Sequence, residues 1–224
     1  MLNRLRALVV RPAAAAPTAR RAVPLASYDR ALRAELKALP RRTQAAFAAA
    51  CAERLYPAYA AFLQASGRDD EGLVRQALDL AWAWAKTDVP QDPDPTDLVE
   101  RCVALIPGDE AGDFFQAYAD DAIASVAYAL QAAAGSEEEA AGRAAQRGTD
   151  SLDTFLLSNQ IDPSLPGADQ RVWEHPLVTA EIRRRDADLR RLSNATDLEA
   201  AVDAVRANAA RVSLLPLEHL DHHV

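Results

Sequence analysis

Apolar residues along most of the chain recur every three or four positions, the spacing that places side chains on one face of an α-helix. Proline, glycine and polar clusters divide this pattern into segments of helical length. The predicted helices cover residues 27–39, 43–63, 69–86, 96–106, 109–134, 136–157, 175–192 and 196–205. No segment alternates between apolar and polar residues strongly enough to predict a strand. We therefore predict an all-α fold: a single compact multi-helix domain of about seven or eight helices.

The segment from Thr43 to Leu63 is the least polar long run, so we expect it to form the central helix. At about 100° per residue, one of its faces carries Phe47, Cys51, Leu55, Ala58 and Phe62. Arg54 falls on this apolar face, whereas Glu53 is expected to point away from it. Pro57 lies inside the segment and removes one backbone donor, which predicts a bend there.

Short signals indicate where several helices begin. A side chain that accepts from the first free N–H groups, often with Glu three residues later, is typical of a helix start. Such signals are Asp69, Ser136 with Glu139, His175 with Pro176, and Thr196 with Glu199. Gly67 and Gly135 are suitable helix ends, and residues 162–168 read as a Pro/Gly loop.

The two ends differ from the body. Residues 1–24 contain five arginines and no acidic residue, in a chain whose net charge is -8. They predict a disordered basic leader or a misplaced start codon, and a transit signal and a basic arm for an acidic partner stay open. Residues 25–212 form the predicted all-helical domain, and residues 213–224 a frayed tail. His219, His222 and His223 in that tail have ligand types for a metal, but chain ends are commonly disordered.

Composition narrows the classes of partner and compartment. A net charge of -8 disfavours a broad nucleic-acid surface, so such binding is expected only through the basic leader. No apolar run reaches the roughly 18 residues that span a bilayer, which predicts a soluble protein without a membrane partner. Cys51 and Cys102 both lie in apolar helical patterns and read as buried thiols of a reducing cytoplasm.

Arg54 is the unusual charge of the sequence. A guanidinium that faces a core needs a carboxylate partner and full hydrogen bonding. We expect Asp121 to be that partner across a helix interface, with Glu53 or Asp79 as substitutes. The alternative is a polar pocket in which Glu53, Arg54, Tyr118 and Asp121 bind a small anion or polar metabolite.

The aromatic residues, His175 and the known sequence motifs give weaker indications of function. Tyrosines at helical spacing usually lie at core edges, and an exposed Trp82 or Trp84 would indicate an interaction surface. His175 can cap a helix or reach solvent. The chain contains no Gly-rich phosphate loop, no G-x-S-x-G elbow and no Cys-x-x-Cys pair. We predict no catalytic residues, no metal site and no cofactor.

Four short stretches carry a resemblance to a known family. They are AFAAACAERLYPAY (46–59), RQALDLAW (75–82), YADDA (118–122) and HPLVTAE (175–181). Across roughly residues 39–192 the chain resembles the YjaG-like bacterial proteins, the domain of unknown function 416 (DUF416). The C-x-E-R-x-x-P-x-Y spacing of the first stretch is the most specific. Membership implies a compact, all-helical, cytoplasmic bacterial protein, and it implies no activity. The basic leader, the Arg183–Arg185 run and the histidine tail depart from the family pattern.

Two functions follow as hypotheses. The first is a non-catalytic cytoplasmic protein that acts through contact with a protein partner, because the body is acidic and lacks a recognisable reaction centre. The second is a small-molecule-binding or enzymatic helical domain built on the pocket around Arg54 and Asp121. A contiguous exposed apolar patch would favour the first, and a uniformly charged surface would count against it.

Overall fold

The computed structural model describes residues 23–70, 72–87, 95–106 and 114–217. These residues form nine helices and no strand. The helices are α2 (Val23–Lys37), α3 (Arg41–Ser66), α4 (Leu73–Lys86), α5 (Pro95–Ala104), α6 (Phe114–Ala134), α7 (Ala140–Asn159), α8 (Ala168–Glu174), α9 (Pro176–Ser193) and α10 (Leu198–Ala209). The all-α prediction is confirmed.

The predicted number of helices is too low by one. Each of the eight predicted segments corresponds to a helix, and the ninth is α8, which occupies seven residues after the predicted loop. Gly167 and Pro176 enclose it, and so short an interval contains too few turns for a helical period to stand out.

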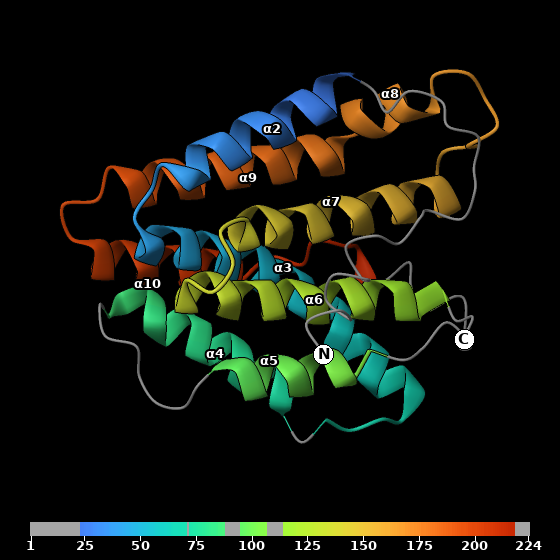
Figure 1. The fold of residues 1–224 in the computed structure, drawn as a ribbon. Coiled ribbons are helices and arrows are strands. Elements are labelled where there is room, and N and C mark those ends of the chain that lie inside the picture. The colour runs from blue at the N-terminus through green and yellow to red at the C-terminus, as the bar shows by residue number, and fades with distance from the viewer. Residues whose placement is uncertain (1–22, 71, 88–94, 107–113, 218–224) are drawn as a thin grey trace.

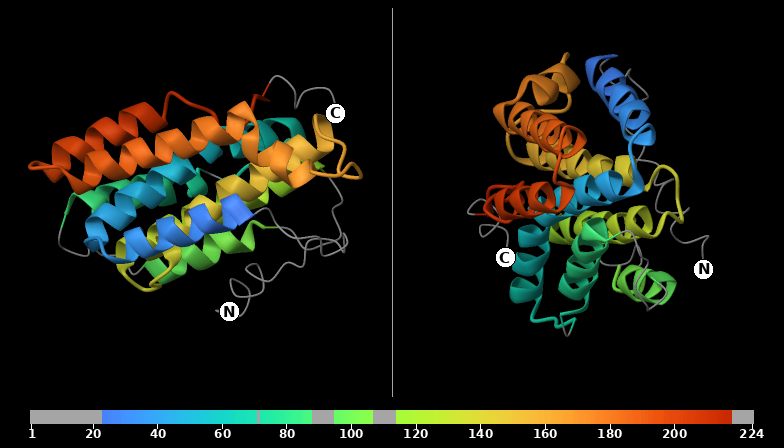
Figure 2. Two further views of the ribbon diagram at one scale, coloured as in Figure 1. Left: turned by 90° about the horizontal axis from the view of Figure 1, so that it is seen from above. Right: turned by 90° about the vertical axis from the view of Figure 1, so that its left-hand side faces the viewer.

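Helix α3 lies at the centre, as predicted (Figures 1 and 2). It packs against α4, α6, α7, α9 and α10, so helices surround most of its circumference. In Figure 1, α2, α8 and α9 form the upper side of the molecule, whereas α4 and α5 form the lower side. Neighbours on several sides explain why α3 is buried on more than one face.

Alanine lets the central helices approach closely. Six of the thirteen residues in the first half of α3 are alanines with at most 1% exposure, and α6 faces it with further buried alanines, among them Ala122, Ala127 and Ala129. Large side chains fill the remaining space, including Phe47, Leu55 and Phe155. The core is therefore built from many short contacts, because small side chains leave little distance between helix axes.

Several helix ends confirm the sequence signals. Gly67 ends α3 in the left-handed conformation at φ 63°, which glycine adopts without steric cost. The backbone N–H groups of Gly135 and Ser136 close the end of α6 on the carbonyls of Ala132 and Gln131. Pro176 begins α9, and His175 Nδ1 accepts from the N–H of Leu177 at 3.3 Å, so this histidine caps the helix.

Three predicted starts are wrong by one or more residues. Asp70, one residue after the predicted Asp69, accepts from the N–H groups of Gly72 and Val74 at the start of α4, whose N-cap residue is Gly72. Ser136 belongs to the end of α6, and α7 begins at Ala140 without a side-chain cap. Asp197 replaces the Thr196 capping box by accepting from the N–H of Ala200. Neighbouring acids and hydroxyls compete for each start, and the tertiary position of the helix decides between them.

The described residues form no contiguous exposed apolar patch of the kind that would indicate an interaction surface. Trp82 and Trp84 are both buried, and Leu165 is the one exposed large apolar side chain among the described residues. None of the described helices combines the length and the apolar character needed to cross a membrane.

The two predicted ends fall partly outside the described residues, as residues 1–22 and 218–224 do. Residues 213–217, at the start of the predicted tail, follow α10 back over α3 and α7. The N–H of Leu214 donates to the carbonyl of Arg54 at 2.8 Å, and Leu214 and Leu215 are buried. Pro57, one turn after Arg54, lacks the N–H that would bond the carbonyl of Glu53.

Candidate functional site

Arg54 lies in a buried cluster of charges between α3 and α9. Its Nη1 donates to Asp188 at 2.7 Å, and its Nη2 and Nε donate to Glu181 Oε1 at 3.0 and 3.2 Å. The side chains of Arg54 and Glu181 are each 2% exposed. The expectation that Arg54 needs an acidic partner is correct, but the partner predicted for it, Asp121, is wrong. The face of α3 that carries Arg54 packs against α9, so residues of α9 complete it.

A second arginine, Arg185, joins the cluster from α9, the helix that also carries Glu181 and Asp188. Arg185 Nε donates to Glu181 Oε1 at 3.0 Å. Its Nη1 reaches the hydroxyl of Thr149 at 2.9 Å, and its Nη2 reaches the carbonyl of Ala145 at 2.8 Å, both on α7. The guanidinium crosses α7 at Gly148, where a Cβ would meet Nη2 at 2.9 Å. The glycine that weakens α7 in sequence thus makes room for a buried cation.

The charges of this cluster balance. Burial alone would raise the pKa of Glu181, but Arg54 and Arg185 hold that pKa below its ordinary value. Burial raises the pKa of Asp188, and its bond to Arg54 opposes that shift. Burial also raises the pKa of Cys51 to about 11, so this thiol next to Arg54 stays protonated. Two cations and two carboxylates pair with one another through Glu181 Oε1 and Asp188, whereas Glu181 Oε2 is buried without a hydrogen-bond partner among the described residues. The cluster joins α3, α7 and α9.

Glu53 enters a different cluster, between α3 and α4. Arg75 donates to both of its oxygens at 2.7 and 3.0 Å, and the indole N–H of Trp82 donates to Oε2 at 2.8 Å. Asp79 accepts from Arg75 at 2.8 Å and also pairs with Arg206 of α10. Glu53 thus points to a different neighbouring helix than Arg54 does, and it is nevertheless buried, because α4 covers that side of α3 as well.

Asp121 forms a third cluster, between α6 and α7. Arg147 donates to it at 3.2 Å and to Asp150 at 2.5 Å, and the hydroxyl of Ser151 donates to it at 2.9 Å. Burial raises the pKa of Asp121 to about 7. Tyr118 is also buried, and burial and the nearby Asp121 charge raise the pKa of its phenol. The four predicted site residues therefore divide among separate clusters, with Tyr118 and Asp121 together, and Glu53 and Arg54 each elsewhere.

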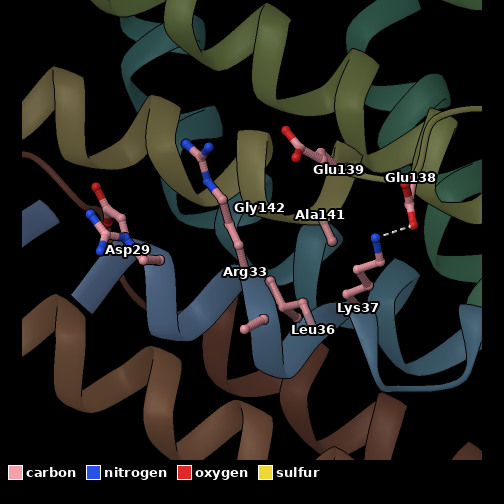
Figure 3. Close-up of a pocket in the computed structure, with 10 residues that line it drawn as sticks. Asp29, Arg33, Leu36, Lys37, Glu138, Glu139, Ala141 and Gly142 are labelled. Carbon is pink, nitrogen blue, oxygen red and sulfur yellow. Dashed lines mark ion pairs between the residues drawn. The ribbon is translucent and has the colours of Figure 1, made fainter. Parts of the chain in front are cut away.

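An open groove lies between α2 and the start of α7 (Figure 3). Its volume is about 490 Å³. Lys37 pairs with Glu138 across one end at 2.6 Å, and Arg33 reaches Gln146 at 2.5 Å. The side chain of Arg33 passes over Gly142, where a Cβ would meet its Cγ at 2.8 Å. Charged side chains therefore form the walls, and Leu36, Ala34, Ala141 and Gly142 supply the apolar part of the lining.

The histidines and cysteines singled out in the sequence do not gather into a metal site among the described residues. No group of three or more His, Cys, Asp and Glu side chains suited to a metal occurs in the described part of the chain. His219, His222 and His223 lie outside the described residues. Cys51 and Cys102 are free, buried thiols.

The chain matches the model of a known protein family over most of its length. The model of the family described as "Protein of unknown function (DUF416)" matches residues 31–213. The chain belongs to the DUF416 family. A search of curated protein sequences finds no significant match. A crystal structure of a DUF416 family protein from Shewanella baltica OS155 is similar in fold, with a TM-score of 0.71 and 19% sequence identity. The match covers 81% of this chain and 95% of that chain.

The DUF416 match contains all three charge clusters, since it runs from α2 to the segment after α10. The sequence prediction missed Glu181, Arg185 and Asp188. Their spacing of four and three residues places them on one face of α9, together with Val178, Leu189 and Leu192. A charged triplet at helical spacing within an apolar stripe was the available signal, and the neighbouring arginines Arg183 and Arg184 obscured it.

Proposed function

We propose that this DUF416 protein is non-catalytic and acts through contact with a protein partner, which it binds in the groove between α2 and α7. The described surface carries no contiguous apolar patch that would favour this hypothesis, so the proposal rests on the contrast between the two polar regions. The charges around Arg54 bond to one another inside the fold, whereas those of the groove line an open hollow at the surface.

The lining of the groove indicates the chemistry of its occupant. Arg30, Arg33 and Lys37 on α2 and Glu138 and Glu139 at the start of α7 place both charges within one hollow. The apolar lining between them is small, because Leu36 and Ala141 are 3% and 1% exposed. This lining favours a short polar segment with side chains of both charges, and it supports a reversible contact, since exposed ion pairs contribute little individually.

The second hypothesis, a ligand pocket around Arg54 and Asp121, gains no support from this arrangement. Arg54 bonds to α9 residues and Asp121 bonds to α7 residues, in different clusters. We infer a cytoplasmic setting, which the two free buried thiols Cys51 and Cys102 support.

The test uses a substitution that fills the groove and removes no existing contact. Ala34 lines the groove and is exposed, so Ala34→Trp should block an occupant without loss of stability. Ala65→Trp, on the exposed end of α3, is the matched control. A photo-crosslinking amino acid at position 34, with position 65 as control, identifies partners in cells. The purified partner should then bind the wild type and Ala65→Trp, but not Ala34→Trp.

Two results would contradict the proposal. One is a purified partner that binds Ala34→Trp as well as the wild type. The other is a metabolite that stabilises the wild type but not Ala34→Trp in a thermal-shift screen. A ligand at about 100 times its dissociation constant adds roughly 2.7 kcal/mol, so such binding would be visible.

A further inference from the structure

Helix α9 carries a row of arginines that make few contacts within the described part of the fold. Its buried face carries Val178, Leu189 and Leu192 with the charged triplet. The opposite face carries Arg183, Arg184, Arg190 and Arg191, here named the arginine face, around the exposed Ala187. Figure 1 shows α9 at the upper side of the molecule, beside α2.

The acids near this face are already engaged. Asp188 pairs with Arg54, and Asp186 accepts from the hydroxyl of Tyr28 at 3.2 Å. Arg190 donates to the backbone carbonyl of Asp186 and to no carboxylate. Within the described part of the chain, Arg184 alone of the four makes an ion pair, a long one of 3.8 Å to Glu181. Three of the four guanidinium groups therefore have no carboxylate partner among the described residues, on a protein whose net charge is -8.

Their spacing is regular. Arg183 and Arg190 are seven residues apart, as are Arg184 and Arg191, so each pair is separated by about 10.5 Å along the helix. Ala187 lies between the two pairs and contributes only a methyl group. A second helix could approach over Ala187 and meet guanidinium groups on both sides at intervals of two helical turns.

We propose that the arginine face of α9 docks an acidic helical segment of another protein. Guanidinium groups bind carboxylates through two parallel hydrogen bonds, and a helix with acidic residues seven positions apart would match both pairs. The net charge of -8 disfavours a nucleic acid as the occupant, because phosphate binding relies on an excess of Lys and Arg. This surface differs from the α2–α7 groove, so the inference stands independently of the proposed function.

The test uses the full chain and a defined probe. The probe is a fluorescent helical peptide that carries two pairs of adjacent glutamates seven residues apart, and a scrambled peptide of equal composition is its control. Fluorescence anisotropy at about 0.15 M salt gives the affinities. We expect the patterned peptide to bind the wild type at least about tenfold more tightly than the scrambled one, and binding should weaken as salt rises.

A charge-matched pair of variants locates the site. Arg183→Glu with Arg190→Glu should weaken peptide binding by about tenfold or more. Arg101→Glu with Arg211→Glu makes the same change of net charge at exposed positions on other elements, and it should bind as the wild type does. Circular dichroism melting of both variants checks that each remains folded.

Each remaining outcome overturns the proposal. Equal loss in both double variants means that net charge, and not the arginine face, attracts the peptide. Tighter binding of duplex DNA than of the patterned peptide assigns the face to nucleic acid. Self-association of the wild type that Arg183→Glu with Arg190→Glu abolishes assigns it to a second copy of the chain. Absence of binding to either peptide removes the docking surface.

Discussion

Replacement of Arg54 by Met tests whether the buried cluster stabilises the fold. Methionine keeps much of the length of the side chain and removes the guanidinium, so three hydrogen bonds to two carboxylates are lost. Breaking a buried ion pair costs about 3–5 kcal/mol, because the remaining charge is left without compensation. Glu181 keeps its bond from Arg185, so we expect a loss near the lower end, about 3 kcal/mol.

The loss in the free energy of unfolding is measurable by urea unfolding, and the fall in Tm by thermal melting, both monitored by circular dichroism. For a chain of this size, each kcal/mol lowers Tm by about 2–4 °C, so Arg54→Met should melt about 6–12 °C lower. The control is Arg101→Met, whose side chain is 58% exposed, and it should change stability by no more than about 0.5 kcal/mol. A loss below about 1 kcal/mol for Arg54→Met would refute the assigned role of the cluster.

A double variant separates pairing from packing. Arg54→Met leaves Asp188 without its guanidinium partner, whereas Arg54→Met with Asp188→Leu leaves Arg185 and Glu181 as a balanced pair. The double variant should therefore be less destabilised than the sum of the single variants. Simple additivity would mean that the two side chains act independently.

Three further substitutions have defined outcomes. Gly148→Ala should cost about 1–3 kcal/mol in urea unfolding because its Cβ meets a buried guanidinium and Leu214, whereas Gly142→Ala, which meets the half-exposed stem of Arg33, should cost less. Leu214→Ala should cost about 2–4 kcal/mol, and an unchanged midpoint would place residues 213–217 outside the cooperative fold. The pKa of Asp121 is raised to about 7 in the folded state, so the folded protein binds more protons than the unfolded chain between about pH 4 and 7. The free energy of unfolding of the wild type, relative to that of Asp121→Asn, should therefore fall as the pH rises from about 4 to about 7, with a slope of at most about 1.4 kcal/mol per pH unit. A difference between the two proteins that stays constant with pH would contradict the raised pKa.

The helices could be predicted from sequence because their signal is local. The apolar period of α3 and the glycine and proline stops around it depend on neighbouring residues alone, and they gave the element and its central place. Which acid accepts from the first N–H groups of α4 depends on competition between adjacent acids. Tyr59 influences it by donating to Asp70 at 3.0 Å. That contact comes from a preceding helix, so a local pattern does not contain it.

The partners of Arg54 required information that no single helix carries. Its burial followed from the apolar face of α3, and so did the need for a carboxylate. The choice among acids depends on which helix covers that face, and α9 lies more than 120 residues later in the chain. Asp121 had a suitable position on its own helix, yet α6 presents it to α7 and Arg147.

The separation between Arg54 and its partners also bears on the order in which the protein folds. The contacts of Arg54 with Glu181 and Asp188 span 127 and 134 positions, so they form only after α9 has docked on α3. Contacts between distant segments commonly form late, after a nucleus of nearer helices has assembled. Loss of the cluster should then accelerate unfolding while leaving the refolding rate nearly unchanged, and the α3–α9 contact would set how long the native state persists.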